Sequence, residues 1–313
     1  MNYELRITNY ECNDRITNCE LVWRYLKSSM AFIAIVTLFI GCENTPTEVA
    51  RYTPEPVFSA YLYNGEPVEA VYLERIATFN PAYDPQNAGI RNASIRIMGG
   101  GDTLNMVEDP GFHGRYIPEA NQFLIPRGRV NYRIEAMTPS NEFLWAETVV
   151  PDTFTDLDVY LMDVPGQRYD VQDGDTLTRE DPLMFWEWPA TESAGGYAGT
   201  IVALTDRDSL VPLDPDWDAA TDSVKMEERQ RANFTVMRED QRRISIAWIF
   251  FQWEGPTRIE LQAVSKSYYD YLFSSFRIRQ GMADRPICNI HGGLGIFSGI
   301  SRKSINVYMK RVE

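Results

Sequence analysis

From residue 55 onward, short segments with alternating apolar and polar residues are separated by turn residues. The clearest segments are residues 57–63, 68–76, 93–98, 130–136 and 143–150, which are rich in β-branched and aromatic side chains. A period of two places apolar side chains on one face of a β-strand. The segments recur at intervals of roughly 8 to 15 residues with few helical patterns between them, as in antiparallel sandwiches. We therefore expect an all-β fold.

The alternating pattern pauses after residue 150 and resumes at residue 157. This pause predicts two tandem immunoglobulin-like β-sandwich domains, over residues 55–151 and 152–313. Residues 92–95, 111–116 and 132–136 resemble a transthyretin- or carboxypeptidase-regulatory-like module, and residues 183–204 resemble the opening strands of a fibronectin-III-like sandwich. Residues 214–232 and 265–276 predict one or two short helices within the second domain. Such folds occur with many functions, so the resemblance to them does not predict an activity.

The first 29 residues contain a near-repeat, because RITNYE at residues 6–11 recurs as RITNCE at residues 15–20. No amphipathic pattern accompanies the repeat, so nothing in it predicts an element that packs on a core. We interpret residues 1–29 as a spurious or disordered extension, with the true start at or shortly before Met30. A short functional arm is the alternative.

An apolar segment follows, over residues 30–41, and contains no charged residue. It is too short to span a bilayer, which takes about 20 residues, but it fits the hydrophobic region of a signal peptide, with Arg24 and Lys27 before it. Gly41 followed by Cys42 resembles a bacterial lipobox, in which the cysteine is lipidated. We expect an outer-membrane lipid anchor at Cys42 and a polar tether to residue 54, on either face of the membrane. The alternative is an ordinary secreted protein with a chance cysteine.

The positions of the cysteines and the net charge bear on two further questions, whether a disulfide forms and whether nucleic acid is a partner. Cleavage before Cys42 would remove Cys12 and Cys19 and leave Cys288, so no intramolecular disulfide is expected and the fold must depend on packing. The formal net charge is −14, from 30 basic and 44 acidic residues. Such a charge repels phosphate backbones, so we expect no nucleic-acid partner.

The sequence offers little material for catalysis or for a cofactor. It contains only two histidines and no G-x-S-x-G, H-E-x-x-H or P-loop motif. Asp214, Asp216 and Asp218 alternate like the start of a calcium-binding loop, but Lys225 stands where such a loop has its bidentate glutamate. We interpret them as a solvated acidic loop and expect no metal, cofactor or catalytic residue.

Two groups of residues are candidates for contact with a ligand or partner. The first group is aromatic and consists of Tyr268, Tyr269, Tyr271 and Trp217. The second lies in the segment NIHGGLGIF at residues 289–297 and consists of Asn289, His291, Gly292, Gly293, Gly295 and Phe297. Packing is the alternative for both groups, because aromatic residues fill sandwich cores and glycines permit tight turns and close backbone approach.

The NIHGGLGIF segment, the YYDYL segment at residues 268–272 and the lipobox together resemble one family. It is the family of uncharacterised Bacteroidetes-type outer-membrane lipoproteins known as domain of unknown function 4249. Its members are usually encoded beside TonB-dependent receptors. The resemblance therefore implies a non-enzymatic accessory or ligand-binding lipoprotein that works with such a receptor in nutrient uptake. The alternatives are an anchored or secreted hydrolase of glycans or peptides, and a structural or adhesion module.

Overall fold

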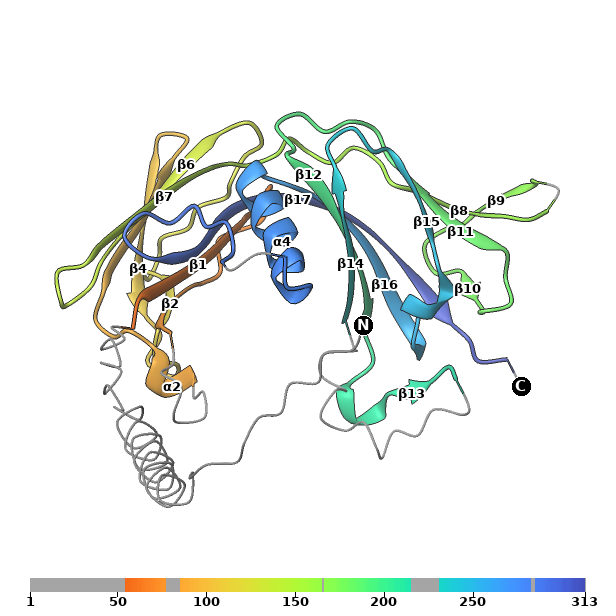
Figure 1. Cartoon of the computed structure of the whole chain (residues 1–313), viewed down its shortest axis with the longest axis horizontal. Helices are drawn as coiled ribbons and strands as arrows, with labels where there is room; N and C mark the ends of the chain where they lie inside the picture. The colour runs from red at the N-terminus through yellow and green to blue at the C-terminus, as the bar shows by residue number, and fades with distance from the viewer. Residues whose placement is uncertain (1–53, 77–84, 165, 215–230, 283–284, 313) are drawn as a thin grey trace, which may run out of the picture. The chain divides into compact units, whose positions relative to one another are not determined.

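The computed structural model describes residues 54–76, 85–164, 166–214, 231–282 and 285–312 (Figure 1). Its first strands are β1 (Pro56–Tyr63), β2 (Val71–Arg75), β3 (Ser94–Gly99), β4 (Asp102–Glu108), β5 (Arg115–Pro118), β6 (Asn131–Met137) and β7 (Phe143–Val149). Its later strands are β8 (Asp158–Met162), β9 (Arg168–Asp170), β10 (Thr176–Leu177), β11 (Leu183–Glu187), β12 (Gly196–Ala203), β13 (Val211–Pro212), β14 (Arg231–Arg238), β15 (Arg243–Ile246), β16 (Trp253–Val264) and β17 (Leu294–Met309). The helical elements are α2 (Pro85–Ala88), η1 (Arg207–Ser209), η3 (Trp248–Phe250) and α4 (Lys266–Arg279).

The described strands form two sheets. The larger sheet has 13 strands, in the order β14-β12-β16-β17-β1-β2-β5-β4-β3-β6-β7, with β10 added beside β17 and β13 beside β16. The smaller sheet has four strands, in the order β15-β11-β8-β9. Neighbouring strands are antiparallel, except that β17 runs parallel to both β1 and β10. The all-β class expected from the sequence is confirmed.

Strand β17 joins the two groups of strands in the larger sheet. Residues 294–300 pair with β1, and residues 300–309 pair with β16. In Figure 1, β17 accordingly runs from beside β1 to beside β16. The first and last strands of the described chain are therefore hydrogen-bonded to each other in the middle of one sheet.

Two hydrophobic cores lie against this framework. The first takes its buried side chains from residues 58–150 together with Ile290 and Phe297, and the second takes them from residues 154–309. Phe297 belongs to the first core, whereas Val307 and Met309 belong to the second, so odd-numbered residues of one strand serve both. The domain boundary at residue 151 stays a prediction, since both cores lie in one compact unit, Pro54–Glu313.

Helix α4 lies against the other face of β17. The Ser265 hydroxyl, at the start of the helix, lies 3.3 Å from that of Ser298. Ser298 and its even-numbered neighbours Ile296 and Ile300 are buried, although they belong to neither core. The predicted helix over residues 265–276 is thus confirmed, with the helix ending at Arg279.

Two local predictions were wrong. The sequence WEGP at residues 253–256 is typical of a turn, but these residues begin β16, where Trp253 and Glu254 pair with β13. Residues 231 and 232 were expected to end a helix, but they begin β14 and pair with β12, while residues 215–230 lie outside the described part. In both places, pairing with a distant strand overrode the local preference.

No helix in the described part of the chain is long and apolar enough to cross a membrane.

A glycine at the start of β17 permits the parallel pairing with β1. Gly295 has a φ of +111°, and a Cβ atom placed there would lie 2.1 Å from the Phe58 carbonyl oxygen. Gly166 has a similar φ of +115°, but nothing lies within 4 Å of its Cβ position. An alanine at either position would have a similarly unfavourable φ, but only at Gly295 would its Cβ atom also meet the backbone of another strand.

We predict that Gly295→Ala lowers the free energy of unfolding by about 3 kcal/mol or more, because a backbone clash adds to the unfavourable φ. Gly166→Ala, the matched control, should cost about 1 kcal/mol from φ alone. Urea unfolding followed by circular dichroism measures both. Equal losses in the two variants would show that the approach of β17 to β1 is not tightly constrained.

Candidate functional site

The NIHGGLGIF segment lies along the edge of β7 before it enters β17. His291 forms an isolated antiparallel bridge with Trp145, with backbone N–O distances of 3.1 and 2.8 Å. The segment thus extends the larger sheet by a short irregular strand beside β7. Its residues are brought together by sheet pairing, as neighbours of β7 and β1.

The Asn289 side chain closes this segment onto β17. Its amide nitrogen donates to the carbonyl oxygens of Phe297 (2.8 Å) and Glu147 (3.2 Å), and its oxygen accepts from the Phe297 backbone N–H (2.9 Å). Asn289 therefore takes the place of a strand partner for Phe297. The Phe297 side chain is fully buried in the first core. Both residues act in packing, so neither presents its side chain to a ligand here.

The glycines of the segment permit close backbone approach. A Cβ atom on Gly292, where φ is +85°, would lie 2.3 Å from the Phe143 carbonyl oxygen. A Cβ atom on Gly293 would lie 2.6 Å from the Pro56 carbonyl oxygen. The packing alternative raised for these glycines therefore accounts for their presence.

His291 and Gly292 are the exposed candidates in the segment, and of the two His291 carries a side chain. Its ring stacks on Trp145, with 3.9 Å between centroids and an interplanar angle of 10°. The Arg133 guanidinium also lies over the Trp145 ring, 4.4 Å from its centroid. Arg133 forms ion pairs with Glu135 and Glu147, and its hydrogen bond to Glu135 is the main cause that raises its pKa. The indole is thus engaged by two neighbours within the protein.

Arg75 binds Pro54, the first described residue. Its guanidinium donates to the Pro54 carbonyl oxygen (3.0 Å) and forms a bidentate pair with Glu142. Ser140 and Thr138 also donate to Glu142. The hydrogen bond from Arg75, followed by that from Ser140, lowers the pKa of Glu142 from 4.5 to about 2. This cluster holds residues 54, 75 and 142 together.

The tyrosines on α4 divide into different roles. Tyr268 packs edge-on against Tyr61 of β1, with 5.5 Å between centroids. Tyr269 stacks on Phe273 and covers Gly196, where a Cβ atom would lie 2.1 Å from the tyrosine ring. Tyr271 is half-exposed. Two of the three therefore attach the helix to the sheet.

The remaining candidates do not assemble into a site. Trp217, Asp216 and Asp218 lie outside the described residues, and Asp214 is exposed after β13. The described part of the chain holds no group of three or more histidine, cysteine or acidic side chains placed to bind a metal.

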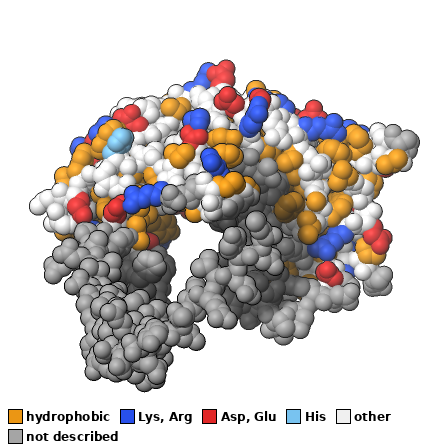
Figure 2. Space-filling view, in the orientation of Figure 1, with side chains coloured by type: hydrophobic (Ala, Val, Ile, Leu, Met, Phe, Trp, Pro, Cys, Tyr) orange, Lys and Arg blue, Asp and Glu red, His pale blue; other side chains and the backbone are white. Residues whose placement is uncertain are grey.

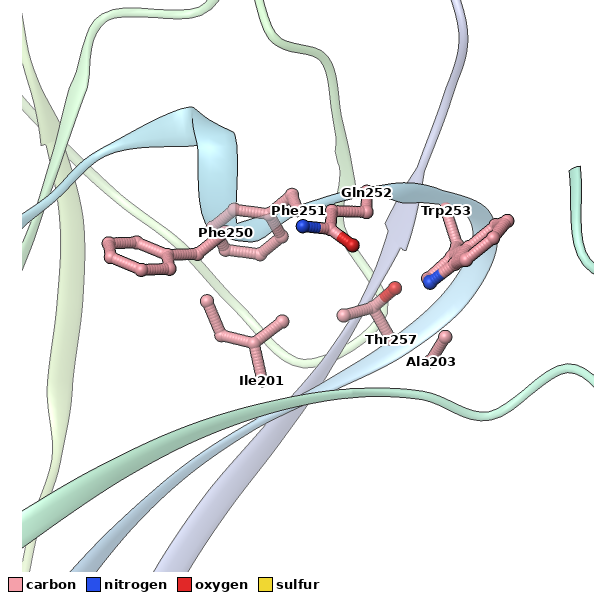
Figure 3. A pocket seen from close by; sticks show the side chains of 7 residues that line it. All are labelled: Ile201, Ala203, Phe250, Phe251, Gln252, Trp253 and Thr257. Carbon is pink, nitrogen blue, oxygen red and sulfur yellow. The ribbon is translucent and has the colours of Figure 1, made fainter. Parts of the chain in front are cut away.

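One pocket lies between η3 and the start of β16. Phe250 and Phe251 lie at one end of it and Trp253 at the other, with Ile201 and Thr257 along the side (Figure 3). Its empty volume is about 200 Å³, part of which is open to solvent. Because part of this volume is open solvent, the space enclosed by these side chains is too small for a drug-sized ligand.

Sequence reasoning missed several residues of this region. Trp145 was read only as part of a strand, and Arg75 and Glu142 carried no motif. Sheet pairing brings these residues together with their contacts, which the sequence does not reveal. The outward position of Trp145 in the alternating pattern of β7 was the only feature of the sequence that pointed to an exposed side chain. Exposed apolar side chains at the end of α4 were missed as well: Phe273, Phe276, Met282 and Ile287.

The lowered pKa of Glu142 predicts a pH dependence of stability. A carboxyl group with a depressed folded pKa stabilises the fold above its unfolded pKa, 4.5, and this contribution is lost as the pH falls toward about 2. We expect about 1–2 kcal/mol, because solvent screens a pair whose side chains are 31% and 33% exposed. Glu142→Gln should remove this part of the pH dependence in urea unfolding between pH 5 and pH 2, as chosen assay limits. The exposed control Glu69→Gln should keep it, and equal curves for both variants would contradict the role of Arg75.

Comparison with known proteins shows the family to which this chain belongs. A search of curated proteins gave no match. Among solved structures, the FN1–FN3 domains of chicken CNTN1 align at 12% identity over 82% of this chain and 68% of that chain, with a TM-score of 0.22, which is too low to carry an argument. The model of a family described as "Domain of unknown function (DUF4249)" matches residues 45–306, which is most of the sequence. The chain therefore belongs to the DUF4249 family.

Proposed function

We propose that this protein is a non-enzymatic outer-membrane lipoprotein that assists a TonB-dependent receptor in nutrient uptake, as an accessory or ligand-binding partner. The observation that carries the proposal is the position of the family match, which begins at residue 45, just after Cys42. The family domain thus starts where a chain cleaved at the lipobox would start. This coincidence supports Cys42 as the lipidated first residue of the mature protein.

The proposal of a receptor as the partner rests on the family resemblance of residues 289–297 and 268–272.

The titratable groups favour a binding role over acid–base catalysis. The described carboxyl groups with a resolved shift, Glu135, Glu142 and Asp240, all have lowered pKa values because each accepts a hydrogen bond from an arginine. A general acid near neutral pH needs the opposite shift.

The proposal is tested by expressing the full chain with its leader and a C-terminal tag, crosslinking gently in cells and identifying the recovered proteins. We expect membrane fractionation and recovery of a TonB-dependent receptor. Cys42→Ser should abolish both, because the anchor is lost. Cys288→Ser is the matched control, since it makes the same change at a half-buried thiol and should leave both unchanged.

Two results would contradict the proposal. Membrane retention of Cys42→Ser at the level of the unaltered chain would contradict the anchor. Recovery of the unaltered chain without any β-barrel receptor, in cells grown on the nutrients that induce it, would contradict the partnership.

A further inference from the structure

A patch of exposed apolar side chains lies at the carboxyl end of α4. Phe273, Phe276, Met282 and Ile287 are 45%, 52%, 53% and 56% exposed. Backbone hydrogen bonds keep them close to the helix, because the Met282 N–H donates to the Arg277 carbonyl oxygen (2.9 Å). The Ile287 N–H likewise donates to the Ser274 hydroxyl (2.8 Å). We call these four residues, with Arg277, the α4 patch.

The segment that contains the α4 patch has a small basic excess in an acidic protein. Residues 266–285 contain four basic residues and two acidic ones, although the whole chain has a net charge of −14. Lys266 at the start of the helix is paired with Asp270, and Arg285 lies 4.0 Å from Glu55, so the charge that the patch itself presents is the exposed Arg277. Figure 2 shows hydrophobic, basic and acidic side chains interspersed over the described surface. Apolar side chains beside an exposed arginine suit an anionic lipid surface, which attracts the charge and accepts the apolar groups.

The place where the described chain begins lies beside this region. The carboxylate of Glu55 lies 4.0 Å from the guanidinium of Arg285, between Met282 and Ile287 in sequence. Arg75 holds the adjacent Pro54. Eleven residues lie between Cys42 and Pro54, and the chain from one to the other spans at most about 40 Å. A lipid attached to Cys42 therefore keeps this part of the protein close to the bilayer.

We propose that the α4 patch docks on anionic lipid headgroups, so that the protein lies with this end of α4 against the membrane that holds its anchor. The position of the patch near the bilayer rests on the lipid anchor of the proposed function. The positive charge of Arg277 and the nearness of Pro54 and Glu55, which follow the expected tether, favour a lipid surface over a protein partner.

The test measures lipid binding without the anchor. Both cores lie within residues 58–309, in the compact unit that starts at Pro54, so a chain from residue 42 onward with Cys42→Ser keeps the fold. We expect this chain to float with vesicles of phosphatidylcholine and phosphatidylglycerol in equal parts, and far less with phosphatidylcholine alone. Added salt should weaken the binding, since it screens surface charge.

Phe276→Ser with Arg277→Glu should reduce the binding constant for the anionic vesicles about tenfold or more. The matched control is Phe123→Ser with Arg127→Glu, which makes the same changes at another exposed site and should have no effect. A second pair, Met282→Ser with Ile287→Ser, tests the apolar part of the patch and should also weaken binding. Circular dichroism and thermal unfolding check that each variant remains folded.

Equal binding to both kinds of vesicle, or equal loss in the α4 and control pairs, would overturn the proposal. Binding by the protein only to a purified receptor, and not to lipid, would assign the patch to a protein partner and overturn it as well. Because this assay uses no lipid anchor and no receptor, its failure would leave the proposed function standing. Failure of the Cys42 test would in turn leave the vesicle result valid.

Discussion

The parallel pairing of β1 with β17 is the interaction on which the rest of the structure depends. It places the last described strand between β1 and β16, so that the two groups of strands become one sheet. One face of β17 supplies Phe297 to the first core and Val307 to the second, while the other face lies under α4 at Ser298. Loss of this strand would remove buried side chains from both cores at once.

The segment before β17 explains how such a pairing is achieved. Glycines let its backbone pass close to Phe143, Pro56 and Phe58, and Asn289 supplies hydrogen bonds where no strand lies. The NIHGGLGIF segment is therefore explained by the architecture. The same architecture brings the start of the described chain next to residues that follow α4, through Glu55 and Arg285. The arrangement links the proposed anchor to an exposed, basic and apolar helix end, which is a physical reason to expect a defined orientation on a membrane.

Alternation with a period of two predicted β1, β2, β3, β6 and β7, because burial of one sheet face is a local property of the sequence. It did not predict that residues 294–298 form a strand, since the glycines there read as a loop and the partner β1 is distant in sequence. A ligand- or partner-binding role for the candidate residues stays a prediction. His291 is exposed and Tyr271 half-exposed, whereas Asn289, Phe297 and the glycines act in packing. Trp145, Arg75 and Glu142 could not be predicted, because their roles depend on cross-strand neighbours.

The central claim is that β17 makes the two cores one cooperative unit. Hydrogen exchange measured by mass spectrometry at increasing urea concentrations tests it, with β6 and β7 reporting on the first core and β16 on the second. The account predicts that amides of both regions lose protection at the same urea concentration, with the same dependence on urea. Loss of protection in one region while the other remains fully protected would contradict the account, because it would show that either core stands without the strand they share.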